Sequence, residues 1–179
     1  MEYTKHQIRR VRDLNDEYFE VVFNKRSLNF VPGSQVKLYK DDVPIFIASG
    51  IGEPWVRIIL DKERFLSKFP AGVNSIRLSL ELDNPMPNLM TDKSPNFLVT
   101  SEAIGAFFSW ASTYPSTKCK VCYLGDSKIQ EDWIKAFHKI VSLKQLKREK
   151  NIYVMGNREL LERKATKVLN ICKESYLDV

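Results

Sequence analysis

Glycine is the residue that this sequence most clearly lacks. It occurs 7 times in 179 residues, which is about half the ordinary usage of about 7%. Glycine-rich turns let a nucleotide phosphate approach the backbone closely. A phosphate-binding turn of that kind is therefore difficult to build in this chain.

Cysteines and long apolar runs are also few. The three cysteines, an odd number, exclude a disulfide-stabilised mini-protein and favour a reducing compartment. No stretch reaches the roughly 18 apolar residues that a membrane-spanning helix needs. The first ten residues, MEYTKHQIRR, lack the apolar core of a signal peptide. We therefore expect a cytoplasmic protein with no membrane partner.

The composition that is present is typical of a folded protein. Hydrophobic residues make up 44% of the chain and charged residues 28%, which excludes disorder as the main state. A length of 179 residues suits one large domain or two small ones.

Positive charge is concentrated in the second half of the chain. Residues 1–95 contain 14 basic and 13 acidic residues, whereas residues 96–179 contain 14 and 9. Such a basic half attracts an acidic protein or a phosphorylated ligand. Its densest run has no interleaved aromatic residue, so a solvated helix face is the simpler interpretation and nucleic-acid binding is not expected. That run consists of Lys144, Lys147, Arg148 and Lys150.

The first half predicts a small antiparallel barrel. Short β-branched and aromatic segments alternate with turn residues, and one short helix is expected over 63–69. In the last of these segments Ile76, Leu78 and Leu80 alternate strictly with polar residues, as in a strand with one buried face. Six such segments at this spacing favour a barrel. The predicted strands are 8–11, 18–23, 35–39, 44–48, 55–60 and 76–82.

The second half predicts a parallel α/β sheet. A proline-rich stretch separates the halves, so we place a barrel domain at 1–88, a linker at 89–95 and an α/β domain at 96–179. Strands and helices then alternate, as in parallel sheets that bind ligands at the carboxyl ends of their strands. The strands are expected at 97–100, 120–124 and 152–155, and the helices at 104–114, 129–141 and 158–172.

Six segments carry a resemblance to a known family. Three lie in the predicted barrel: residues 30–36 (FVPGSQV), 43–49 (VPIFIAS) and 70–72 (PAG). Three lie in the second half: residues 98–109 (LVTSEAIGAFFS), 123–127 (YLGDS) and 152–157 (IYVMGN). In this order they resemble motifs of the ferredoxin–NADP reductase superfamily, whose members join an FAD-binding barrel to a nicotinamide-binding α/β domain.

The resemblance implies a flavin-dependent oxidoreductase. Such an enzyme takes hydride from NAD(P)H onto bound FAD or FMN. It then passes electrons to a small acceptor or to an acidic electron-carrier protein. Ser49 and Ser101 would take the catalytic positions. The expected cofactor-binding residues are Phe46, Ile47, Ala48, Ser49, Ser101, Glu102, Gly125, Ser127 and Gly156.

The chain departs from the family where the family holds its nucleotides. Val43 and Ile45 replace the arginine that grips the FAD pyrophosphate and the tyrosine that stacks on the flavin. Ser101 and Ala103 replace two glycines of the nicotinamide turn, and Glu102 brings negative charge to that turn. About ten residues separate Val141 from Ile152, too few for the strand–helix unit that the family has there.

These departures keep a second function open. The chain could retain the fold, without catalysis, as a binding or interaction module. Single residues also have simpler interpretations: Ser49 and Ser101 as caps of turns, and Phe46 and Trp55 as barrel core.

The cysteines and histidines do not form a recognisable site. Cys119 and Cys122 are three apart, so on one strand they point to opposite faces, and neither metal nor dithiol chemistry is favoured. Neither His6 nor His138 has a suitably spaced partner for a hydrolytic triad.

Overall fold

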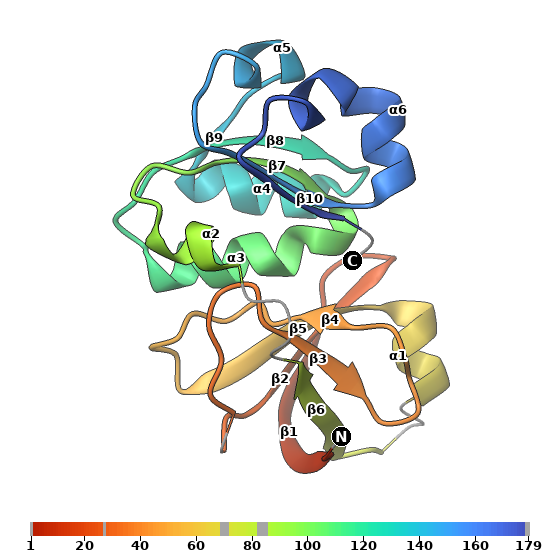
Figure 1. Cartoon of the computed structure of the whole chain (residues 1–179). Helices are drawn as coiled ribbons and strands as arrows, with labels where there is room; N and C mark the ends of the chain where they lie inside the picture. The colour runs from red at the N-terminus through yellow and green to blue at the C-terminus, as the bar shows by residue number, and fades with distance from the viewer. Residues whose placement is uncertain (1, 27, 69–71, 82–85, 178–179) are drawn as a thin grey trace.

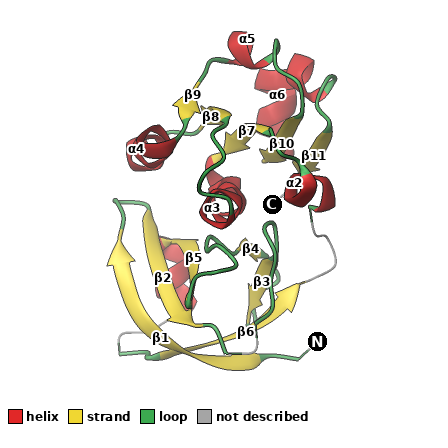
Figure 2. Cartoon of the chain, turned by 90° about the vertical axis from the view of Figure 1, so that its left-hand side faces the viewer, coloured by secondary structure: helices red, strands yellow, loops and turns green. Residues whose placement is uncertain are grey.

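The computed structural model describes residues 2–26, 28–68, 72–81 and 86–177. Its first half is the predicted six-stranded antiparallel barrel (Figures 1 and 2). The sheet has the order β4-β3-β6-β1-β2-β5, and a bridge between Ile47 and Ile58 joins its two ends, so the barrel is nearly closed. The strands are β1 (Thr4–Asp13), β2 (Tyr18–Asn24), β3 (Gln35–Leu38), β4 (Ile45–Phe46), β5 (Trp55–Asp61) and β6 (Ser75–Glu81).

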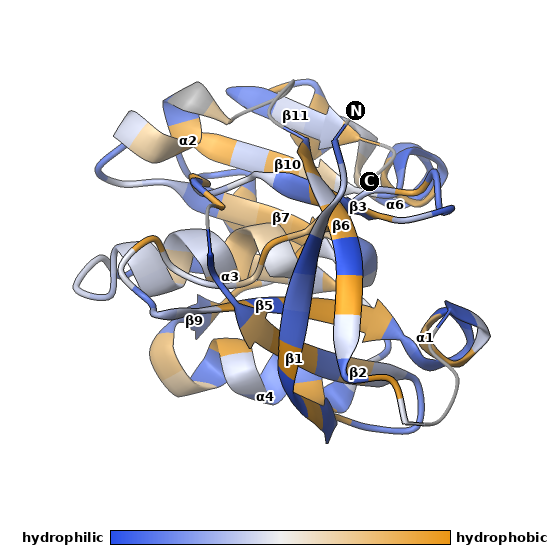
Figure 3. Ribbon diagram, turned by 90° about the horizontal axis from the view of Figure 1, so that it is seen from below, coloured by the Kyte–Doolittle hydropathy of each residue, from blue (hydrophilic) through white to orange (hydrophobic). Residues whose placement is uncertain are grey.

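Alternating burial explains why these segments form a barrel. In β5 the side chains of Val56, Ile58 and Leu60 are buried, and the residues between them are more exposed. The same alternation of polar and apolar residues is visible along β6 (Figure 3). The short helix α1 (Lys62–Lys68) follows β5 and packs Phe65 against the barrel core. Residues 70–71, which belong to one of the sequence motifs, and residue 82, the end of the last predicted barrel strand, lie outside the described residues.

The second half is a five-stranded parallel sheet of order β11-β10-β7-β8-β9. Helices α3 (Ile104–Thr113) and α4 (Lys128–Phe137) cover the face toward the barrel, and α5 (Leu143–Leu146) and α6 (Arg158–Leu169) cover the other (Figures 1 and 2). The strands are β7 (Asn96–Thr100), β8 (Lys120–Leu124), β9 (Lys139–Ile140), β10 (Ile152–Gly156) and β11 (Glu174–Leu177).

The single helix predicted over 129–141 is wrong. Helix α4 ends at Phe137, the backbone of His138 is extended, and the strand β9 follows. A capping box between Ser142 and Gln145 then starts α5. The strand–helix unit expected to be missing is therefore present in miniature. The apolar residues 140 and 141 continued the helical pattern, because a short strand and the buried residue that follows it can use apolar residues too.

The segment predicted as a linker begins inside a short helix. Helix α2 (Pro87–Thr91) occupies its beginning, and Leu89 is fully buried in the core beneath α3. Phe46 from the barrel belongs to the same core, together with Phe97, Phe107 and Trp110. One apolar cluster therefore spans both halves and joins them. No helix within the described residues is both long and apolar enough to cross a membrane.

Phe97 lies at the centre of this shared core, and its ring contacts those of Phe107, Trp110 and Tyr153. We expect Phe97→Ala to lower the free energy of unfolding by about 3–5 kcal/mol, because it leaves a cavity. Phe137→Ala is the control: this ring is 77% exposed, and its loss should change stability by less than about 0.5 kcal/mol. Urea denaturation measures both, and equal losses would contradict the assignment.

Candidate functional site

The direction of the strand order reverses between β7 and β10 of the parallel sheet. Strands β7 and β10 are neighbours, but the chain leaves β7 toward α3 on one face and leaves β10 toward α6 on the other. Ligands of doubly wound sheets bind at such a reversal, beyond the carboxyl ends of the strands. Thr100, Ser101, Gly156 and Asn157 lie there. Thr100 is buried, and its hydroxyl accepts a hydrogen bond from the Asn157 amide at 3.2 Å.

Gly125 and Gly156, two of the predicted cofactor-binding residues, lie at the carboxyl ends of the strands and allow neighbouring side chains of the protein to pack there. A Cβ on Gly156, whose φ is +136°, would lie 1.9 Å from Thr100 Oγ1. A Cβ on Gly125 would lie 2.2 Å from both Ser101 Oγ and the Tyr123 hydroxyl. The space that each glycine keeps open is therefore filled by neighbouring side chains of this chain.

The other predicted residues of this edge form a hydrogen-bonded surface. Ser101 Oγ lies 2.9 Å from the Tyr123 hydroxyl, which donates to Gln130 Oε1 at 2.6 Å. Burial raises the pKa of Tyr123. Glu102 is exposed in the 3-10 turn Ser101–Ala103 before α3. Burial, helped by the charges of Glu17 and Glu102, raises the pKa of Tyr18 to about 12. Glu102 therefore adds negative charge at this end of the sheet.

Ser127 is a helix cap that also joins the two halves. Its hydroxyl accepts from the Gln130 amide at the start of α4 and from Asn15 Nδ2, in the turn between β1 and β2, at 3.0 Å. Both acceptor lone pairs of the hydroxyl are therefore used within the protein.

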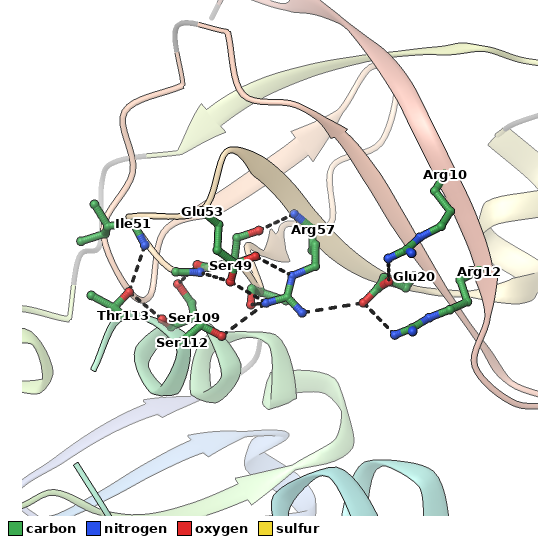
Figure 4. A network of polar contacts seen from close by, with 12 residues as sticks. Arg10, Arg12, Glu20, Ser49, Ile51, Glu53, Arg57, Ser109, Ser112 and Thr113 are labelled. Carbon is green, nitrogen blue, oxygen red and sulfur yellow. Dashed lines mark hydrogen bonds and ion pairs between the residues drawn. The ribbon is translucent and has the colours of Figure 1, made fainter. Parts of the chain in front are cut away.

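The predicted flavin segment is buried between the barrel and α3. Phe46, Ile47, Ala48 and Ser49 are each 5% exposed or less. Ser49 Oγ accepts from the backbone amide of Arg57 (Figure 4), and its carbonyl accepts from Ser109 Oγ of α3 at 2.7 Å. Phe46, Ile47 and Ser49 thus serve packing between layers.

The residues in this segment do not fit a flavin. Ile45, in the position of the family's stacking tyrosine, belongs to the barrel core. Phe46 lies so close to α3 that a Cβ on Gly105 would be 3.0 Å from its own Cβ. Val43, in the position of the family's arginine, is apolar and 55% exposed. This segment offers neither an accessible ring to stack on an isoalloxazine nor a cation for a pyrophosphate.

A different group of polar residues lies between the barrel and α3 (Figure 4). The Arg57 guanidinium pairs with Glu53 at 2.7 Å and with Glu20 at 3.8 Å, and it donates to Ser112 Oγ of α3 at 3.3 Å. The Glu20 side chain is 5% exposed, and Arg10 and Arg12 each lie 3.3 Å from one of its oxygens. A carboxylate this deeply buried needs such partners.

This group borders a cavity of about 390 Å³, which we call the barrel–helix cavity. Among the nine predicted site residues, Ala48 alone lines it. One feature of the sequence could have indicated this polar group. Glu20 and Arg57 are charged residues that lie between apolar residues of predicted strands. The lining residues are Arg12, Glu20, Ala48, Arg57, Ile59, Phe107, Phe108, Ala111, Ser112, Pro115, Trp133, Ala136, Phe137 and His138.

Cys119 and Cys122 lie on opposite faces of the sheet, as predicted. Cys119 packs in the core beneath α3, and Cys122 packs in the core on the opposite face. Burial raises the pKa of Cys119 to about 12 and that of Cys122 to about 11, so both are protonated and unreactive at neutral pH. Within the described ranges no three His, Cys, Asp or Glu residues are grouped as metal ligands.

Comparison with known proteins identifies the fold. No protein-family model and no curated protein matches this sequence. Solved structures do match the fold. The ferredoxin–NADP⁺ reductase from Neisseria gonorrhoeae with bound FAD and NADP is 12% identical, with a TM-score of 0.74 over 99% of this chain and 98% of that one.

Two further structures agree. The ferredoxin–NADP⁺ reductase from Plasmodium falciparum with 2′P-AMP is 8% identical, with a TM-score of 0.71 over 99% of this chain and 96% of that one. Phthalate dioxygenase reductase, described as a modular structure for electron transfer from pyridine nucleotides to [2Fe-2S], is 10% identical. Its TM-score is 0.75 over 98% of this chain and 67% of that one.

Gly125 offers a direct test of the filled edge. We expect Gly125→Ala to lower the free energy of unfolding by about 1–3 kcal/mol, because the new methyl group meets Ser101 and Tyr123. Gly52→Ala is the matched control, since a Cβ there meets no atom within 4 Å. Thermal unfolding compares the two. A neutral Gly125→Ala would mean that the edge is open.

His138 predicts a pH dependence of stability. Burial lowers the pKa of His138 below its usual value of 6.5, so folding favours the neutral imidazole. That contribution is complete above pH 6.5 and is lost as the pH falls through the folded pKa. Between about pH 7.5 and about pH 5 the wild type should therefore lose more stability than His138→Gln. Identical losses in urea titrations would refute this role.

Proposed function

Because this chain has the fold of ferredoxin–NADP reductases, we propose that it is a binding module built on that fold, without flavin chemistry. One observation supports the proposal most directly: the segment at the family's flavin position is buried, and its residues are engaged in contacts between β4, β5 and α3. A fold of this kind supports many functions, and the function depends on the site.

The carboxyl edge of the parallel sheet supports the same proposal. A nicotinamide pyrophosphate needs open backbone at the turn after β7 and a positive field. Here Ser101 and Tyr123 occupy the space beside Gly125, and Glu102 adds negative charge. The edge therefore disfavours the ligand that this fold otherwise receives. We place the module in the cytoplasm, where the three free cysteines stay reduced.

A second candidate is the flavin-dependent oxidoreductase itself. The match to reductases spans 99% of this chain, and the strand order keeps the reversal between β7 and β10. In this function NAD(P)H would reduce FAD or FMN beside Ser49 and Ser101. Electrons would pass to a small acceptor or to an acidic carrier protein bound by the basic second half.

Absorption of the purified protein separates the two candidates. The module should show no flavin band near about 450 nm and should take up neither FAD nor FMN during gel filtration. Glu102→Gln is the companion variant, since this exposed side chain can be neutralised without disturbing the core. If the edge received a nucleotide pyrophosphate, the variant should bind NADPH more tightly. We expect no NADPH binding with or without it.

The opposite result is equally clear. A bound flavin whose band is bleached by NADH or NADPH would establish the oxidoreductase and refute the module. In that case electron transfer to an acidic carrier should weaken as salt screens the basic half.

A further inference from the structure

The barrel–helix cavity has the size and place of a small-molecule site. Its volume of about 390 Å³ lies within the range of about 300–1,000 Å³ that such sites occupy. It is separate from the carboxyl edge of the sheet. That edge precedes the start of α3, whereas the cavity is lined by Ala111, Ser112 and Pro115 from the other end of that helix.

One wall of the cavity is aromatic. Phe108 of α3 and Trp133 of α4 face each other edge to face, with ring centroids 5.4 Å apart. Phe137, the last residue of α4, lies beside them and is 77% exposed. Exposing a large aromatic ring to water is unfavourable, and a flat apolar ligand would cover it.

The opposite wall is cationic. Glu20 is the buried carboxylate there, and its two oxygens are already paired with Arg10 and Arg12, with Arg57 nearby. Arg57 is further satisfied by Glu53. Three guanidinium groups thus share two carboxylates, which leaves one positive charge uncompensated.

Arg12 is the group that presents this charge to the cavity. Its side chain is 49% exposed, and in the part of the chain that the structure describes its guanidinium has one polar interaction, with Glu20. A guanidinium has five N–H donors, so Arg12 retains donors for a second carboxylate. Arg10 makes the same contact with Glu20 but does not line the cavity.

We propose that the barrel–helix cavity binds a small aromatic carboxylate, with its ring against Phe108, Trp133 and Phe137 and its carboxylate on Arg12. The proposal deepens the binding function proposed above and rests on it. An aromatic wall opposite a single uncompensated guanidinium selects an aromatic ring that carries one negative charge. A neutral ring would leave Arg12 without its second partner and bind less tightly.

Calorimetric titration of the full chain tests this with 1-naphthoate and with the neutral 1-naphthamide, which has nearly the same shape. We expect 1-naphthoate to bind one per chain and the amide to bind at least about tenfold more weakly. Arg12→Gln should remove this preference by weakening naphthoate binding at least about tenfold. Phe137→Ala should weaken both ligands.

Arg10→Gln is the matched control, since it also removes one ion pair from Glu20 but none from the cavity wall. Its naphthoate affinity should equal that of the wild type. Equal losses in Arg10→Gln and Arg12→Gln would refute direct recognition by Arg12, and equal binding of naphthoate and naphthamide would refute recognition of charge. Absence of naphthoate binding in a protein that also takes up no flavin would overturn the ligand class alone. NADPH-bleached flavin would overturn the binding module itself.

Discussion

Arg57 lies between apolar residues in the barrel strand β5, and its guanidinium reaches across to Ser112 of α3. A charge in this position must be paired, and Glu20 and Glu53 provide the pairing. The backbone amide of the same residue binds Ser49, whose carbonyl in turn binds Ser109. These contacts hold the barrel against α3. They explain why the segment at the family's flavin position is closed and why a cavity remains beside the arginine.

In the proposed module, the ligand site differs in place from the nucleotide site of the related fold. This chain keeps the reversal of strand order between β7 and β10. However, the side chains of Thr100, Ser101 and Tyr123 fill the space beside Gly125 and Gly156. The open volume lies instead between the barrel strands and the helices α3 and α4. Fold similarity at 8–12% identity thus establishes the architecture, whereas the side chains determine which ligand can bind.

The local residue pattern predicted the structure correctly where only one kind of secondary structure explains that pattern. Strict alternation of apolar residues predicted β6, and the three-residue spacing correctly separated Cys119 from Cys122. The residue pattern gave a wrong prediction where two kinds of secondary structure require the same residue types. The apolar residues after Phe137 suited a longer helix and a short strand equally, and pairing with β8 decided for β9. The four-residue strand β11 went unpredicted because its pairing with β10, not its own short sequence, makes it a strand.

The sequence alone determined the order of elements, the barrel followed by a parallel sheet, and the scarcity of glycine at the family's nucleotide turns. These properties depend on periodicity and on residue type, which are local. Only the tertiary structure decided which contacts the predicted site residues make. Whether Ser49 faces a ligand or a helix, and whether Gly125 opens a turn or admits Tyr123, depends on residues up to 60 positions away. Contacts between residues so far apart in the chain produce no repeating pattern in the sequence. The arginine-lined cavity could therefore be identified only from the folded structure.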